Sequence, residues 1–101
     1  MSIRSLLSED EQELRITIKG RFDFSTHQEF RRSYETLKTR PARYLVDLAE
    51  TNYLDSSALG MLLLLRDHAS NDHARVDIVN CNADVKKILI ISNFEQLFNI
   101  Q

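Results

Sequence analysis

A short apolar strand followed by a capped, leucine-rich helix limits this chain to a fold that mixes strands and helices. Residues 44–48 are apolar at most positions, which is typical of a strand inside a sheet. Asp55 and Ser56 then precede the run Met61–Leu65, in which leucine outnumbers β-branched residues. Leucine favours helix, and Asp and Ser are common at helix starts, so a helix is predicted from about Ser57 to Ala69.

Alternation and turn residues predict an N-terminal hairpin and a first helix. Residues 14–19 alternate apolar and polar side chains, as in a strand with one covered face, and residues 3–7 form a weaker strand before them. Ser25 with Gln28, or Thr26 with Glu29, has the spacing of a capping box. A helix is therefore predicted from there, with Phe30, Tyr34 and Leu37 on one stripe and a stop before Pro41.

The C-terminal part continues the alternation of strand and helix. Residues 75–79 predict a strand, residues 85–89 a short helix, and residues 94–100 a final turn that docks on the core. Asn93 can end the short helix because asparagine accepts the left-handed conformation. Crossover helices between strands imply a partly parallel sheet. We predict one α/β domain over residues 1–101, with a mixed four- to five-stranded sheet and about four helices mainly on one face.

Composition excludes several classes of function. The net charge of −2 argues against nucleic acid as a partner, because phosphate binding needs a basic surface. The longest apolar run, Met61–Leu65, is far too short to cross a membrane. A single cysteine, Cys81, excludes an intramolecular disulfide. With no signal peptide at the N-terminus, a cytoplasmic protein is expected.

Ser56 and Ser57 are the candidate functional residues. A helix start has unpaired N–H groups and the positive end of the helix dipole, so a hydroxyl there can cap the helix and an added phosphate would be tolerated. Asp55 could itself be the cap, which would leave Ser56 free at the surface; alternatively, both serines only cap. Helical spacing assigns one set of side chains on this helix to the core and places a second set closer to solvent, with Met61 and Leu64 undecided between the two. The core set is Ala58, Met61, Leu62, Leu65 and Ala69; the others are Leu59, Leu63 and Leu64.

Catalytic and metal-binding motifs are not recognisable in the sequence. Asp23 and Asp55 are carboxylates without a second catalytic partner, and the three histidines lack metal-ligand spacing. A serine hydrolase would need a histidine near Ser56. A receiver domain could use Asp47, but the chain opens with a hairpin and has too few strand–helix units. We therefore expect no enzyme activity, no cofactor and no metal.

Residues 53–60 carry a pattern that resembles a known family. Tyr-Leu-Asp-Ser-Ser-Ala-Leu-Gly is similar to the hydrophobic-x-Asp-Ser-Ser-Gly-Leu-Gly signature of STAS domains, specifically the stand-alone bacterial anti-sigma factor antagonists. Gly20-Arg21-Phe22-Asp23 looks like the family's Gly-x-hydrophobic-Asp element, and residues 85–100 look like its closing helices. Ala58 departs from the pattern by replacing a glycine, which should favour the helix. Asn93 also replaces a glycine.

The resemblance implies a STAS-like fold and reversible phosphorylation of Ser56. A cognate serine kinase would add the phosphate and a PP2C-type phosphatase would remove it. The unphosphorylated form would bind an anti-sigma factor and free its sigma factor, and the phosphorylated form could have a second signalling partner. A constitutive interaction scaffold is the alternative. The partner surface expected around Ser56 comprises Asp23, Asp55, Ser57, Ala58, Leu59, Gly60 and Met61.

Overall fold

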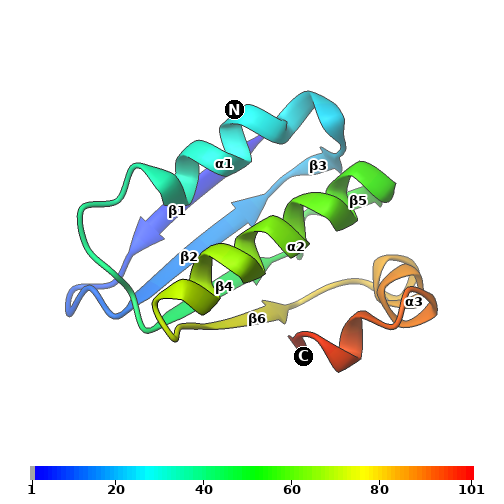
Figure 1. Cartoon of the computed structure of the whole chain (residues 1–101). Helices are drawn as coiled ribbons and strands as arrows, with labels where there is room; N and C mark the ends of the chain where they lie inside the picture. Colours follow the sequence, from blue (N-terminus) through cyan, green and yellow to red (C-terminus); the bar gives the residue numbers. More distant parts are fainter. Residues whose placement is uncertain (1) are drawn as a thin grey trace.

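The computed structural model describes residues 2–101 and has a five-stranded mixed sheet at its centre (Figure 1). The strands are β1 (Ile3–Leu7), β2 (Glu13–Ile18), β4 (Arg43–Asp47), β6 (Arg75–Val79) and β7 (Asn99–Ile100). They lie in the order β1-β2-β4-β6-β7; β1 is antiparallel to β2 and every later pair is parallel. The predicted hairpin and the predicted mixed sheet are confirmed.

A second, two-stranded sheet lies at the end of the first. β3 (Gly20–Phe22) follows β2 and pairs in parallel with β5 (Thr51–Leu54), which follows β4. Gly20 has a φ of +81°, a left-handed conformation that favours glycine, so it is suited to the bend between β2 and β3. The sequence did not predict this pair, because strands of three and four residues carry too little periodicity.

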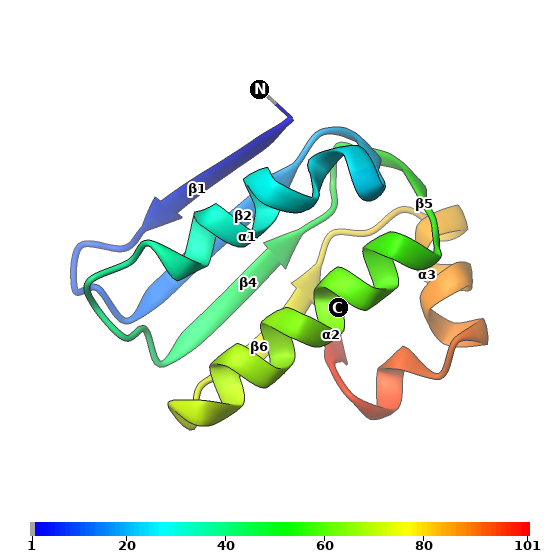
Figure 2. The same cartoon turned by 45° about the horizontal axis from the view of Figure 1, so that its top comes forward.

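Three helices accompany the sheets: α1 (His27–Glu35), α2 (Ser56–Asn71) and α3 (Ala83–Ile91). Figures 1 and 2 show α1 and α2 side by side on one face of the sheet, with α3 beyond its end. Short 3-10 turns, η1 (Phe24–Thr26) and η2 (Phe94–Gln96), precede α1 and β7. Asn93 has a φ of +61° just after α3, so its predicted left-handed conformation is confirmed.

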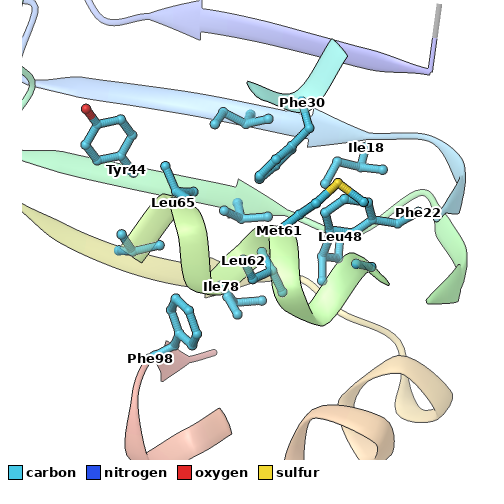
Figure 3. Close-up of a cluster of buried hydrophobic side chains, with 14 of the residues drawn as sticks. Ile18, Phe22, Phe30, Tyr44, Leu48, Met61, Leu62, Leu65, Ile78 and Phe98 are labelled. Atoms are coloured by element: carbon cyan, nitrogen blue, oxygen red, sulfur yellow. The ribbon is translucent and has the colours of Figure 1, made fainter. Parts of the chain in front are cut away.

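The core lies between the sheet and the two covering helices. The inward side chains of β2 and β4 alternate with outward ones, and Leu14, Ile16, Ile18 and Val46 are at most 1% exposed. Figure 3 shows Leu62 and Leu65 of α2 directed into this layer. The alternation predicted for residues 14–19 is therefore the burial pattern of β2, apart from a one-residue shift of its limits.

Two predictions about the first helix were wrong. Thr26 is the residue before α1 but its side chain does not cap the helix; its hydroxyl donates to the Asp23 carbonyl at 2.8 Å. The capping role passes to Asp23, which caps the intervening turn η1, so the capping box is not formed. The helix also ends at Glu35, and Leu37 lies outside it while still packing against the core.

Candidate functional site

Asp55 caps α2, and this leaves the first serine of the helix free. Its backbone is extended, and its Oδ1 accepts a hydrogen bond from the Ala58 N–H at 3.0 Å. That bond satisfies one of the unpaired donors at the helix start. Of the two alternatives that the sequence left open, the structure therefore selects Asp55 as the cap, and the alternative in which the serines cap is wrong.

Ser56 is the first residue of α2 and its side chain is exposed, whereas Ser57 is half-buried. Within residues 2–101, no hydrogen bond engages the Ser56 hydroxyl. The site has the positive end of the helix dipole behind it, so a negative group on this oxygen would be favoured. A modifying enzyme could therefore reach the hydroxyl without breaking a structural contact.

Pairing of β3 with β5 brings a second carboxylate to the same edge. Phe22 is the register partner of Leu54, so Asp23 and Asp55 each follow a residue of one pair. Each of the two aspartates then caps the turn or helix that begins after it. The sheet therefore aligns two capped helix starts at one edge.

Asp23 is held by three donors. Its carboxylate accepts from the Ser25 N–H at 3.0 Å, from the Ser25 hydroxyl at 2.5 Å and from Arg21 Nε at 3.1 Å. The Ser25 hydroxyl, and after it Arg21, hold the pKa of Asp23 below its ordinary value. Asp23 is therefore a charged, fixed group rather than a proton donor at neutral pH.

Arg21 and Tyr53 are surface residues that the sequence prediction missed. They face each other across the β3–β5 pair, and the Arg21 guanidinium carbon lies 4.0 Å from the centre of the Tyr53 ring. Such a cation–π contact orients a charge over an exposed aromatic face. Both residues lie two positions before an aspartate, Asp23 and Asp55 respectively, and that shared spacing is the signal that could have identified them.

Two residues of the expected partner surface are instead in the core. Ala58 is fully buried and Met61 is 3% exposed, because both lie on the helical stripe that faces the sheet. Figure 3 shows Met61 directed toward Phe22 and Ile18. The expectation that Ala58 and Met61 belong to a partner surface was wrong.

The exposed stripe of α2 runs along the other side of the helix. Gly60 is exposed one turn after Ser56, and Leu63 and Leu64 follow with 38% and 50% exposure. Leu59 is half-buried against the core. Apolar side chains therefore reach the surface within two turns of the free hydroxyl, as a protein-binding face requires.

β5, the strand that leads to Ser56, pairs with β3 on one side and contacts the start of α3 on the other. The Asn82 side-chain amide donates to the Thr51 carbonyl of β5 at 3.1 Å, and the same side chain caps α3 through the Val85 N–H. Beyond this cap, Ile88 and Ile91 are 36% and 70% exposed. The segment that precedes Ser56 is thus fixed on both sides.

The described residues contain no metal-ligand cluster, and His68 lies far from Ser56 along α2. In residues 2–101, no three His, Cys, Asp or Glu side chains cluster as metal ligands would. His68 lies along α2 about 18 Å from Ser56, at 1.5 Å per residue, and packs on Tyr34 with ring centres 4.8 Å apart. That histidine cannot act as a base for the serine. Across the same residues, no helix combines the length and apolarity needed to span a membrane.

Comparison with known proteins decides the family. A family model described as "Mlab, STAS domain" matches residues 5–99. The chain belongs to the STAS-domain family. A STAS-domain containing protein from Pseudomonas aeruginosa is 60% identical over 100 residues, which are 99% of each chain.

Solved STAS domains confirm the fold. The anti-sigma factor antagonist SpoIIAA in its unphosphorylated form gives a TM-score of 0.77 at 14% identity and covers 98% of this chain and 86% of that one. The phosphorylated form of SpoIIAA, a Bacillus cell fate determinant, gives 0.75 at 14% identity and covers 98% and 90%. The predicted α/β fold with a mixed sheet is therefore that of a STAS domain.

Proposed function

We infer that this STAS domain is an anti-sigma factor antagonist whose partner changes when Ser56 is phosphorylated. The unphosphorylated form binds an anti-sigma factor in the cytoplasm and frees its sigma factor. A serine kinase adds the phosphate and a PP2C-type phosphatase removes it. The observation that carries the proposal is that Asp55, not Ser56, caps α2, so the exposed hydroxyl can be modified without loss of the cap.

The structural similarity to SpoIIAA supports a proposal of this type. SpoIIAA is described as an anti-sigma factor antagonist and occurs in unphosphorylated and phosphorylated forms. Asp55, Ser56 and Ser57 keep the Asp-Ser-Ser order of the family signature. An accessible hydroxyl at a helix start is the structural requirement for such a modification, and Ser56 meets it.

A phosphate on Ser56 would affect a partner far more than the fold. It adds about −1.5 to −2 charges at neutral pH. Facing a partner carboxylate at about 5 Å, with an effective dielectric near 20, each unit of charge costs about 3 kcal/mol. That is roughly a hundredfold loss of affinity per unit of charge. The helix dipole favours the phosphate by about 0.3–1 kcal/mol, so the fold should not be destabilised.

The docking face that we propose combines the fixed carboxylates with the exposed side chains of α2. Asp23 and Asp55 mark its polar edge, and Gly60, Leu63 and Leu64 supply its apolar part. Gly60 has no Cβ, which allows a partner's backbone to approach the helix one turn from Ser56. A phosphate on Ser56 would therefore lie at the edge of the contact, where its charge acts on the partner.

The test is a direct titration of both forms of the protein with an anti-sigma factor from the same organism. The unphosphorylated protein should bind, and the phosphorylated protein should bind at least a hundredfold more weakly. Ser56→Ala should bind like the unphosphorylated form after kinase treatment, and Ser57→Ala is the matched control that still responds. Equal binding of both forms would contradict the switch and indicate a constitutive scaffold.

A further inference from the structure

β1 leaves the longest unpaired edge of the five-stranded sheet. It is the first strand in the order and pairs only with β2. In Figure 2, β1 is the outermost strand on its side of the sheet. The opposite edge, β7, has two residues, whereas β1 has five and contains no proline or lysine. Proteins usually protect such an edge, because it can pair with another strand.

The hairpin register shows which residues of β1 face inward. The Lys19 N–H donates to the Ser2 carbonyl at 2.7 Å, and the Ser8 N–H donates to the Glu13 carbonyl at 2.9 Å. Both pairs continue the register that aligns β1 with β2. Because bonded and non-bonded residues alternate in an antiparallel pair, the even-numbered residues of β1 direct their backbone groups toward β2.

The odd-numbered residues of β1 therefore direct their N–H and C=O groups toward the free edge. These are Ile3, Ser5 and Leu7, spaced evenly about Ser5. Ser5 is exposed and Leu7 half-buried, so this edge is accessible in the single chain. A strand that approaches here finds three donors and three acceptors at regular spacing.

We propose that the occupant of this edge is β1 of a second copy of the chain, paired antiparallel about a twofold axis at Ser5. The two copies of Ser5 then face each other, and Ile3 of each copy faces Leu7 of the other. Each of these pairs exchanges two backbone hydrogen bonds, about six in all. On the other side of the sheet Arg4 faces Leu6 of the second copy, so no like charges are opposed.

Charges on α1 favour a second copy over an unrelated peptide. A hollow beside β1 is lined by Ile3 and Ser5 together with Glu29 and Arg32 of α1. Glu29 is half-buried at this hollow and Arg32 beside it is exposed. The twofold axis reverses the direction of the second α1, so Glu29 of each copy faces Arg32 of the other. The same surface thus complements itself in backbone register and in charge, as a twofold contact requires.

Sedimentation across a range of concentrations tests this proposal on the intact chain. The wild-type protein should pass from an 11.8 kDa monomer to a dimer between micromolar and near-millimolar concentration. Ser5→Pro should weaken the dimer at least tenfold, because proline removes a donor at the free edge while every bond to β2 is kept. Thermal melting of this variant at low concentration checks that its monomer is folded.

A charge exchange provides a test that leaves the backbone untouched. Arg32→Glu should weaken the dimer at least threefold by placing Glu29 against a second carboxylate, and adding Glu29→Arg in the same chain should restore it. Lys87→Glu on α3 is the matched control with the same change of charge and should have no effect. A monomer at every concentration would overturn the proposal, even if β1 took up a strand from another protein. A dimer indifferent to Ser5→Pro, or a double variant that fails to recover, would also overturn it.

Discussion

Asp23 and Asp55 cap two helix starts at the β3–β5 edge, and these starts differ in the hydrogen bonding of the serine that follows each aspartate. Asp23 accepts both the N–H and the hydroxyl of Ser25, in addition to Arg21. Within residues 2–101, the Asp55 carboxylate accepts only from the Ala58 backbone N–H, and the hydroxyl of Ser56 beside it is free. An aspartate next to a serine can therefore either engage or spare the hydroxyl. Spacing alone does not decide, because Ser57 lies two residues after Asp55, as Ser25 does after Asp23, and within residues 2–101 its hydroxyl makes no hydrogen bond to Asp55.

The largest expected difference between these starts is in phosphorylation. A cognate kinase should modify Ser56 and leave Ser25 unmodified, because the Ser25 hydroxyl is already bonded to a carboxylate. Intact-mass analysis should show one phosphate on the wild-type and Ser25→Ala proteins and none on Ser56→Ala. Phosphate found on Ser25 would break the comparison.

Removal of the cap at Asp55 should give the next largest effect. Asp55→Ala leaves the Ala58 N–H without its acceptor and should lower the free energy of unfolding by about 1 kcal/mol. For a domain of this size that is a fall in Tm of about 4–8 °C. Asp55→Asn, which keeps an acceptor oxygen, is the matched control and should lose less. If Ser56→Ala destabilised the fold as much as Asp55→Ala, the assignment of the cap would be contradicted.

Gly60→Ala should change stability in the opposite direction. Gly60 lies within α2, and an added Cβ would meet no atom within 4 Å. Alanine should therefore stabilise the helix by about 0.4–1 kcal/mol. Chemical denaturation measures this gain, and titration with the anti-sigma factor should show weaker binding, because the new methyl group lies on the proposed docking face. A gain in stability with unchanged affinity would remove Gly60 from that face.

The smallest expected effect concerns the pH dependence of Asp23. Since hydrogen bonds from Ser25 and Arg21 lower the pKa of Asp23 in the folded state, its contribution to stability is present near neutrality and is lost as the pH falls below about 4. Asp23→Asn should be less stable than wild type near neutral pH, and the difference should shrink on acidification. Denaturation at several pH values measures this, with Asp10→Asn as a control at another carboxylate of lowered pKa. If the stability difference between wild type and Asp23→Asn grew as the pH fell, the assigned lowering of the Asp23 pKa would be contradicted.

Long, strongly patterned segments were predictable from the sequence. The alternation of apolar and polar residues predicted β2, the apolar run at residues 44–48 predicted β4, and the leucine content predicted α2. The Asp-Ser-Ser segment at the start of α2 also indicated the candidate site and the family. These features depend on neighbours within a few residues, which is the information that a single sequence carries.

Features that depend on tertiary pairing were not predictable. β3 and β5 are too short to be recognised alone and exist because each pairs with the other. That pairing also brings Arg21 over Tyr53. Met61 was ambiguous because α2 has more apolar positions than one stripe needs, and the packing of Phe22 and Ile18 around it decides its burial.

Asp55 caps α2 and Ser56 carries the proposed phosphate, and the assignment of these roles to two different residues has a genetic consequence. Because the carboxylate secures the helix, nearly any amino acid at position 56 should yield normal cellular amounts of protein. In a library of all substitutions at codon 56, protein abundance should therefore stay constant while signalling output changes. Substitutions at codon 55 should reduce both abundance and signalling output. Regulation could then be lost or rewired by one nucleotide change without any accompanying defect in folding.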